Sequence, residues 1–234
     1  MGRSIPALLA SHHLQRASQL GEVSDAVHFR LTEISGRLVE LSGDGASSAL
    51  TVAVGLVLEA QRAGEPVAWV SATTAPFFPP DLAESGVDLQ ALVVVRLKGA
   101  MTSSARLARD ETSSADRDPP RRTVGLALRA ADRLLRSGGF GLVVLDLGPV
   151  AGLPLPAQTR LCGLVQRHDS LLLCLTEKSD GAPSLGSLIS MHAWAHRRRL
   201  RDGRFACEVR ILKDKRRGPG WVHREVCRAP AGLR

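Results

Sequence analysis

Residues 37–71 read RLVELSGDGASSALTVAVGLVLEAQRAGEPVAWVS, and this stretch decides the fold class. An apolar strand over 37–42 is followed by a loop of small residues, an Ala/Leu/Val-rich helix over 47–63 and a second apolar strand over 66–71. Continuous apolar strands that alternate with helices are typical of a parallel sheet buried on both faces. The stretch therefore predicts a βαβ unit of the kind that holds nucleotide phosphates at the loop after its first strand.

The loop after the first strand lacks the side chains that such a site uses. A P-loop reads G-x-x-x-x-G-K-[ST]: its backbone N–H groups surround the phosphates, its Lys reaches the terminal phosphates, and its hydroxyl holds Mg²⁺. Counted from Gly43, this chain has Ser48, Ala49 and Leu50 at the last three positions. The helix N-terminus at Ser47 could still attract an anion. However, Ala49 supplies no charge and Leu50 no metal ligand, so we expect ATP hydrolysis to be lost.

Apolar runs after this unit extend the sheet. They predict strands over 91–96, 141–147 and 170–177, and helical patterns over 123–137 and 156–168. From residue 195 the pattern changes to AHRRRL, RFACEVRILKDK and WVHREVCRA, which indicate strands joined by tight turns. We therefore predict an α/β fold with a mostly parallel sheet, flanked by helices, and an antiparallel C-terminal edge.

The remaining segments define the domain organisation. Residues 1–36 are amphipathic and mostly helical by pattern, with a break at Gly36 before the first strand. Residues 98–122, KGAMTSSARLARDETSSADRDPPRR, contain almost no large apolar side chains, which predicts a mobile loop. We assign residues 37–230 to one core domain, because a chain of 234 residues can bury a single full core.

Composition limits the possible classes of function. The chain is 44% hydrophobic but only 3% aromatic, so its core must consist mostly of Leu, Val and Ala. Its four cysteines include no C-x-x-C pair, and we expect neither a metal nor a cofactor. No segment approaches the ~18 apolar residues of a membrane span, and the N-terminal apolar stretch is too short for a signal peptide. We therefore expect a cytoplasmic protein.

Positive charge is concentrated near the C-terminus. Between residues 197 and 217, ten Lys and Arg side chains face three acidic ones, in a chain of net charge +8. Such a basic strip can neutralise several phosphates, with affinity that depends on salt but not on sequence. Alternatively, it is a solvated edge that keeps sheets from associating. The candidate partner-binding or DNA-binding residues are Arg197, Arg198, Arg199, Arg201, Arg204, Arg210, Lys213, Lys215, Arg216 and Arg217.

From about residue 36 to residue 228 the chain resembles the core of the RecA recombinases. GRLVELSGDGASSALTVAVGLVLEAQRAG resembles the segment around the RecA P-loop, and GFGLVVLDLGPVAGL resembles the Walker B strand, with Asp146 at the acidic position. SLLLCLTE matches the strand that ends in a nucleotide-sensing Gln, here Glu177. VRILKDKRRG matches the strand whose two lysines, here Lys213 and Lys215, reach a neighbouring subunit's ATP.

The chain departs from RecA at the residues that perform the chemistry. The alignment of VAWVSATTA puts Thr73 at the position of the catalytic carboxylate, and a hydroxyl is no general base at neutral pH. The stretches that match the two DNA-binding loops, about 148–157 and 178–186, are short. A short RecA-like core with eroded ATPase residues is similar to ImuA, a SulA-like accessory family of bacterial mutagenesis cassettes. This resemblance implies that Asp146 is a relic of a Walker B acid and Glu177 a relic of a sensor; from its position at a strand end, Glu177 is equally well explained as a surface residue.

Two classes of function remain open at this stage. The resemblance to ImuA implies a non-catalytic accessory role in DNA-damage tolerance, in translesion synthesis or SOS mutagenesis. Its partner would be RecA, an ImuB-type polymerase-like protein or both, with non-specific DNA as a further candidate ligand, and limiting RecA filaments is one way it could act. The alternative is a weak or unconventional DNA-dependent ATPase of the RecA superfamily. In that case a basic residue outside the motif must replace the missing lysine, and Arg62 lies roughly 20 Å along the helix from Ala49.

Overall fold

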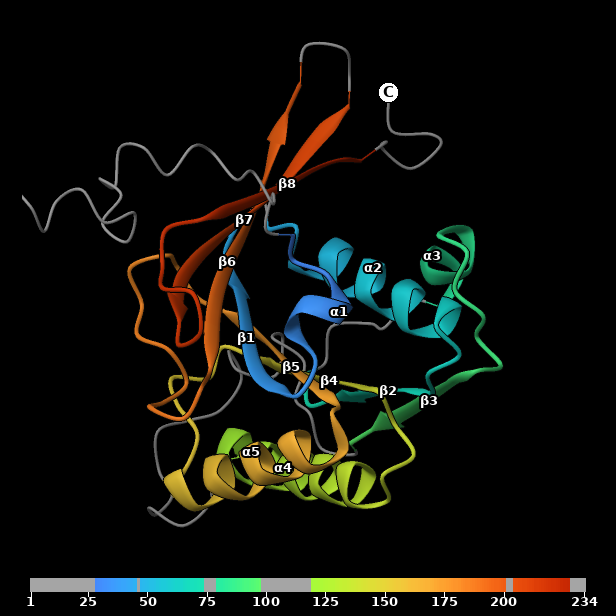
Figure 1. Ribbon diagram of the computed structural model, residues 1–234, viewed down its shortest axis with the longest axis vertical. Helices are drawn as coiled ribbons and strands as arrows, with labels where there is room; N and C mark the ends of the chain where they lie inside the picture. Colours follow the sequence, from blue (N-terminus) through green and yellow to red (C-terminus); the bar gives the residue numbers. More distant parts are fainter. Residues whose placement is uncertain (1–27, 46, 74–78, 98–118, 201–203, 228–234) are drawn as a thin grey trace, which may run out of the picture.

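The computed structural model describes residues 28–45, 47–73, 79–97, 119–200 and 204–227, which form a sheet with helices on both faces (Figure 1). The strands are β1 (Arg37–Gly43), β2 (Val67–Ser71), β3 (Leu92–Arg96), β4 (Leu142–Gly148), β5 (Leu171–Glu177), β6 (Met191–Arg199), β7 (Phe205–Asp214) and β8 (Val222–Cys227). The helices are α1 (Leu31–Ile34), α2 (Ala49–Arg62), α3 (Pro79–Glu84), α4 (Pro119–Arg136) and α5 (Leu155–His168).

The sheet has eight strands in the order β3-β2-β4-β5-β1-β6-β7-β8. The neighbours from β3 to β6 pair in parallel, whereas β7 pairs antiparallel with both β6 and β8. The predicted α/β fold with an antiparallel C-terminal edge is therefore confirmed. One boundary differs, because β6 begins at Met191 rather than at residue 195. Its first four residues pair in parallel with Val39–Ser42 of β1 on one side and antiparallel with β7 on the other.

Helices cover the sheet in two layers, with α1, α2 and α3 on one face and α4 and α5 on the other (Figure 1). Side chains of β1 alternate between two buried clusters: Val39 and Leu41 pack against α2, whereas Leu38 packs toward α4 and α5. The inner strands β1, β4 and β5 are mostly apolar, as expected for strands that are buried on both faces.

Several predicted helix and loop boundaries differ from the structure. Helix α2 begins at Ala49 rather than at residue 47. Helix α4 begins at Pro119, so residues 119–122 belong to this helix and not to the predicted loop. The rest of that loop, 98–118, lies outside the described residues. So do residues 1–27 of the predicted N-terminal helical segment, of which α1 is the described helix.

A buried ion pair joins the start of β1 to the end of β7. The Arg37 guanidinium donates to the Asp214 carboxylate over 2.5 Å and to the carbonyl of Ser190 over 2.9 Å. Both charged side chains are at most 2% exposed. Burial alone would raise the pKa of Asp214, but the hydrogen bonds from Arg37 and from the Arg216 backbone outweigh burial and hold that pKa below its ordinary value. The pair therefore fixes the antiparallel edge to the parallel part of the sheet.

Candidate functional site

The loop between β1 and α2, where a P-loop would hold phosphate, is bound to β6 by its own hydroxyl groups. Ser47 Oγ donates to the carbonyl of Ala195 over 3.3 Å and accepts the N–H of Ala49 over 3.0 Å. Ser48 Oγ donates to the carbonyl of His196 over 2.8 Å. The Ser47 side chain thus occupies a backbone donor at the start of α2 that an anion would otherwise use.

The same loop leaves little space and no positive charge beside the end of β1. A Cβ atom placed on Gly43 would lie 2.0 Å from Ser47 Oγ and 2.8 Å from the carbonyl of Ala195. Ala49 is buried, while Leu50 is 59% exposed. Residues 43–50 read GDGASSAL, in which Asp44 is the charged residue. The helix N-terminus predicted to attract an anion is therefore preceded by a negative charge and closed by a hydroxyl.

Asp44 connects this loop to a row of side chains on β6 and β7. Its carboxylate accepts the indole N–H of Trp194 over 3.2 Å. The Trp194 ring stacks on His196, with ring centroids 4.7 Å apart, and the guanidinium of Arg210 lies 5.2 Å from the Trp194 ring. Arg210 also forms a 3.1 Å ion pair with Asp180, in the loop after β5. This row of side chains holds the loop between β1 and α2, which we call the closed loop, to strands β6 and β7.

The predicted Walker B acid and the predicted base position lie in contact at the C-terminal ends of β4 and β2. Thr73 Oγ1 donates to Asp146 Oδ2 over 2.9 Å. Burial raises the pKa of Asp146 to about 6; the Thr73 hydrogen bond lowers it and the charge of Glu177 raises it. Glu177 is exposed at the end of β5. In the described residues, His, Cys, Asp and Glu side chains nowhere gather in the threes that a metal ion needs.

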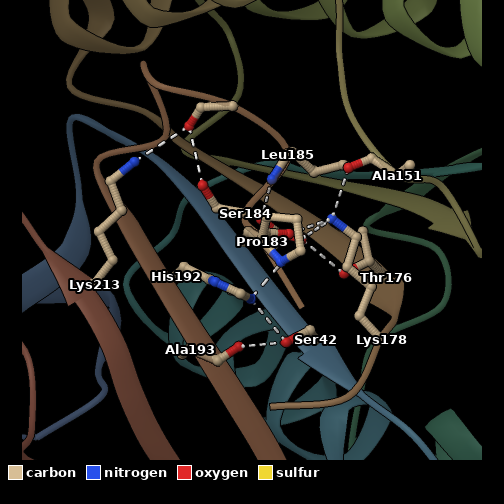
Figure 2. A network of polar contacts seen from close by, with 12 residues as sticks. Ser42, Ala151, Thr176, Lys178, Pro183, Ser184, Leu185, His192, Ala193 and Lys213 are labelled. Atoms are coloured by element: carbon tan, nitrogen blue, oxygen red, sulfur yellow. Dashed lines mark hydrogen bonds and ion pairs between the residues drawn. The ribbon is translucent and has the colours of Figure 1, made fainter. Parts of the chain in front are cut away.

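Beside the C-terminal ends of these strands lies a buried polar network that includes Thr176, Lys178, Leu185 and His192 (Figure 2). Glu40 is its centre, because it accepts hydrogen bonds from the first three of these residues. The Glu40 side chain, in the middle of β1, is 0% exposed. Its Oε1 accepts hydrogen bonds from Lys178 Nζ over 2.9 Å and from Thr176 Oγ1 over 3.0 Å. Its Oε2 accepts the backbone N–H of Leu185 over 2.6 Å. The carboxylate therefore has partners at both oxygens, as a buried charge requires.

Lys178 connects the loops that follow β4 and β5. Besides Glu40, its ammonium group donates to the carbonyl of Ala151 over 3.2 Å and to that of Pro183 over 3.1 Å. All three hydrogen-bonding positions of the ammonium are thus used inside the chain, and the Lys178 side chain is 7% exposed. The loop of residues 178–190 is therefore fixed to the loop of residues 149–154 and to the sheet.

A buried histidine extends the network along β6. His192 Nε2 lies 2.9 Å from Ser42 Oγ, and Ser42 Oγ donates to the carbonyl of Ala193 over 3.1 Å. With the single hydroxyl proton on that carbonyl, the tautomer that fits is the one in which His192 Nε2 donates to Ser42. Burial lowers the pKa of His192, although Glu40 opposes this effect, so the imidazole is neutral at pH 7.

Lys213 and Lys215, which the RecA resemblance assigned to a neighbouring subunit's ATP, have different surroundings. Lys213 Nζ donates to the carbonyls of Gly186 and Ser187, over 3.2 and 3.4 Å, so it binds the loop after β5 of its own chain. Burial, together with the charge of Lys215, lowers the pKa of Lys213. Lys215 is exposed.

The predicted basic strip has one cluster at each end of β7, with Arg210 and Lys213 along the strand between them. β7 is ten residues long, which places its ends about 30 Å apart, so Arg197–Arg199 and Lys215–Arg217 lie at opposite ends. The two clusters are close in the sequence. The hairpin between β6 and β7 places Arg197–Arg199 beside the start of β7, and the length of β7 separates them from Lys215–Arg217. At the start of β7, the Arg197 guanidinium lies 4.7 Å from the Phe205 ring, Arg198 pairs with Glu208, and Arg199 is exposed. After the end of β7, Arg216 is exposed and Arg217 pairs with Glu33. Arg201 lies outside the described residues.

The sequence analysis missed Glu40, Lys178 and His192. A signal for Glu40 was present in RLVELSG, where this carboxylate lies in the middle of a strand that is otherwise mostly apolar. Such a residue is almost never fully buried without a partner, which makes a search for a cation worthwhile. The partner itself could not be identified from the sequence, because Lys178 lies 138 positions away.

Comparisons with known proteins agree with a RecA-like core. No protein-family model matches the chain. Over 112 residues, 47% of this chain, it is 36% identical to the protein RecA of Nocardioides sp., of which it covers about a quarter of the length (25%). The fold is similar to that of a KaiC-like protein from Pyrococcus horikoshii, with a TM-score of 0.53 over 84% of this chain and 90% of that one, at 15% identity. Among the described residues, no helix is long and apolar enough to cross a membrane.

Asp146 gives a test of the electrostatics at this edge. Because its pKa rises from 3.8 to about 6 on folding, the folded chain binds this proton more tightly than the unfolded chain does. Stability is therefore lost as pH rises through about 6. Asp146→Asn removes the charge and keeps an acceptor for Thr73. We expect it to raise the free energy of unfolding by up to ~3 kcal/mol at pH 8 and by less than ~1 kcal/mol at pH 4.

Urea unfolding of both proteins at the two pH values measures this difference. Equal free energies of unfolding at pH 8 would show that the charge of Asp146 carries no burial cost.

Proposed function

We propose that this chain is a non-catalytic, RecA-like accessory protein that acts in DNA-damage tolerance by binding RecA, an ImuB-type partner, or both. The observation that carries the proposal is the closed loop after β1, where Ser47 binds the Ala49 N–H and the Ala195 carbonyl. A RecA-like core has kept its sheet while its phosphate loop is bound to its own β6. The identity to RecA over 112 residues supports a role beside RecA itself.

The residues at this edge do not fit Mg²⁺ and ATP. Ala49 and Leu50 supply neither the cation nor the hydroxyl that a P-loop uses, and Asp44 adds negative charge beside the position of the phosphates. Asp146 is held by Thr73, which is no general base at neutral pH. Each electrostatic group lost from an active site typically costs ~2.7–4 kcal/mol of transition-state stabilisation, so several losses together bring turnover to background.

ATP binding separates this proposal from an unconventional ATPase. Titration of Mg²⁺ and ATP into the full chain in a calorimeter should give no binding heat, with a Kd weaker than ~1 mM. The reason is that the backbone donor at Ala49 is already used by Ser47, and residues 43–50 contain no Lys or Arg. A RecA with an intact P-loop serves as the positive control. DNA-stimulated phosphate release that Asp146→Asn abolishes would instead establish the ATPase alternative.

Partner binding is tested on two sensor surfaces, bare single-stranded DNA and the same DNA coated with RecA in a non-hydrolysable ATP analogue. At 150 mM salt we expect at least tenfold tighter binding to the RecA-coated surface. Binding to bare DNA should fall steeply with salt, and further when Arg197, Arg198 and Arg199 are changed to Glu. Changing Lys215, Arg216 and Arg217 to Glu makes the same change of charge at the opposite end of β7 and shows which of the two clusters carries the binding.

Equal affinity for the two surfaces would make DNA the ligand and remove RecA as the partner. Binding to neither surface would remove both and leave an ImuB-type protein as the candidate.

A further inference from the structure

Strand β8 is the last strand of the sheet, and one side of its backbone points away from β7 (Figure 1). The N–H of Ile211 donates to the carbonyl of Trp221 over 3.0 Å, which fixes the positions along β8 that bond to β7. In an antiparallel pair these positions alternate with positions whose N–H and C=O groups point the other way. The outward-pointing residues of β8 are therefore Val222, Arg224 and Val226.

The side chains at these three positions are exposed. Val222 is 41% exposed, Val226 is 57% exposed, and the Arg224 side chain between them is 67% exposed. Alternate side chains of a strand lie on one face, so the three form a short row that is apolar at both ends. The strand, VHREVC, contains neither Lys nor Pro, which often keep an edge strand from pairing with another chain.

The sequence of β8 is complementary to itself when two copies run antiparallel with Arg224 on the two-fold axis. Each Val222 then lies opposite Val226 of the other copy, so exposed apolar side chains cover each other. On the other face, each His223 lies opposite Glu225 of the other copy. Within one chain His223 Nε2 already lies 3.3 Å from Glu225 Oε1. The hydrogen bond from His223 lowers the pKa of Glu225, which is therefore ionised at pH 7.

The two neighbouring registers are less favourable. With Glu225 on the axis, two carboxylates meet and Val226 lies opposite Arg224 of the other copy. With His223 on the axis, two imidazoles meet and Val222 lies opposite Arg224 of the other copy. The register centred on Arg224 is therefore the one in which apolar side chains meet apolar ones and a carboxylate meets a histidine.

The centre of this register brings two arginines together, but each is held by its own chain. Arg224 Nε lies 3.2 Å from Oε1 of Glu208, which is opposite Arg224 on β7. The guanidinium is thus drawn inward, away from the outer side of β8. Like charges directly opposite each other still weaken a strand pair. We therefore expect a dimer of moderate affinity, with a Kd on the order of 10 µM.

We propose that two copies of this chain associate through β8, antiparallel and with Arg224 on the two-fold axis, so that their sheets join into one. The occupant of this edge is a second copy because the complementarity is that of β8 with itself, and such a contact closes after two chains. The inference goes beyond the proposed function, since it requires neither RecA nor DNA as the ligand.

Sedimentation velocity of the full chain, over about 1 to 100 µM, tests the association. We expect the average mass to rise from that of a monomer toward that of a dimer. Val226→Lys places a charge opposite Val222 of the other copy and should raise the Kd at least tenfold. Val93→Lys makes the same change at a 45% exposed valine of β3, at the opposite edge of the sheet. This matched control should change the Kd less than twofold.

Cysteine crosslinking tests the register. Arg224→Cys places two thiols opposite each other, with Cα atoms about 5.5 Å apart, so mild oxidation should give a covalent dimer. In Glu225→Cys the two Cα atoms would lie more than ~7 Å apart, which is too far for a disulfide. The unchanged chain, with its own four cysteines, is oxidised beside both variants as the background.

Four results would overturn the proposal. Three are a monomer at every concentration, a dimer that Val226→Lys leaves intact, and a crosslink through Glu225→Cys but not through Arg224→Cys. The fourth is slow exchange of the Arg224 amide hydrogen at concentrations where the chain is a monomer, because another segment of the same chain would then cover the edge of β8.

Discussion

The buried carboxylate of Glu40 is the constraint on which the loops at the C-terminal ends of the parallel strands depend. A charge at 0% exposure is tolerable only with partners at both oxygens, and the chain supplies Lys178, Thr176 and the N–H of Leu185. Removal of one member of such a buried pair typically costs ~3–5 kcal/mol, because the other charge stays buried and unpaired. Since these partners come from β5 and the loop after it, satisfying Glu40 also determines where that loop lies.

Open α/β sheets usually bind their ligands at the C-terminal ends of their parallel strands. In this chain internal contacts take that place: Ser47 and Ser48 bind β6, Thr73 binds Asp146, and Lys178 joins the loops after β4 and β5. Asp44 and Asp146 near the closed loop are held by Trp194 and Thr73. The nearby cations Lys178 and Arg210 are already paired with Glu40 and Asp180. A site that in RecA-like proteins would need cations for phosphate is here self-contained, which supports the proposed binding role over a catalytic one.

Much of the fold could be predicted from the sequence because the inner strands are buried on both faces and so appear as continuous apolar runs. The starts of the five predicted parallel strands lie within one residue of those in the structure. β6 was the exception, since MHAW mixes polar and apolar residues and gives no such run. The site was harder to predict. Proximity in the sequence suggested one basic strip where the hairpin makes two clusters, and partners of Glu40 more than 130 positions away leave no local signal.

The exchange rate of the Leu185 amide hydrogen tests the central claim, that Glu40 locks the loop after β5 onto the sheet. This N–H lies in an irregular loop and donates to a buried carboxylate over 2.6 Å. In the unchanged chain, exchange measured by NMR should be as slow as that of the β1 amides, which open only when the sheet does. In Lys178→Met it should become much faster than exchange in β1. Rapid Leu185 exchange in the unchanged chain, typical of a surface loop, would contradict the lock.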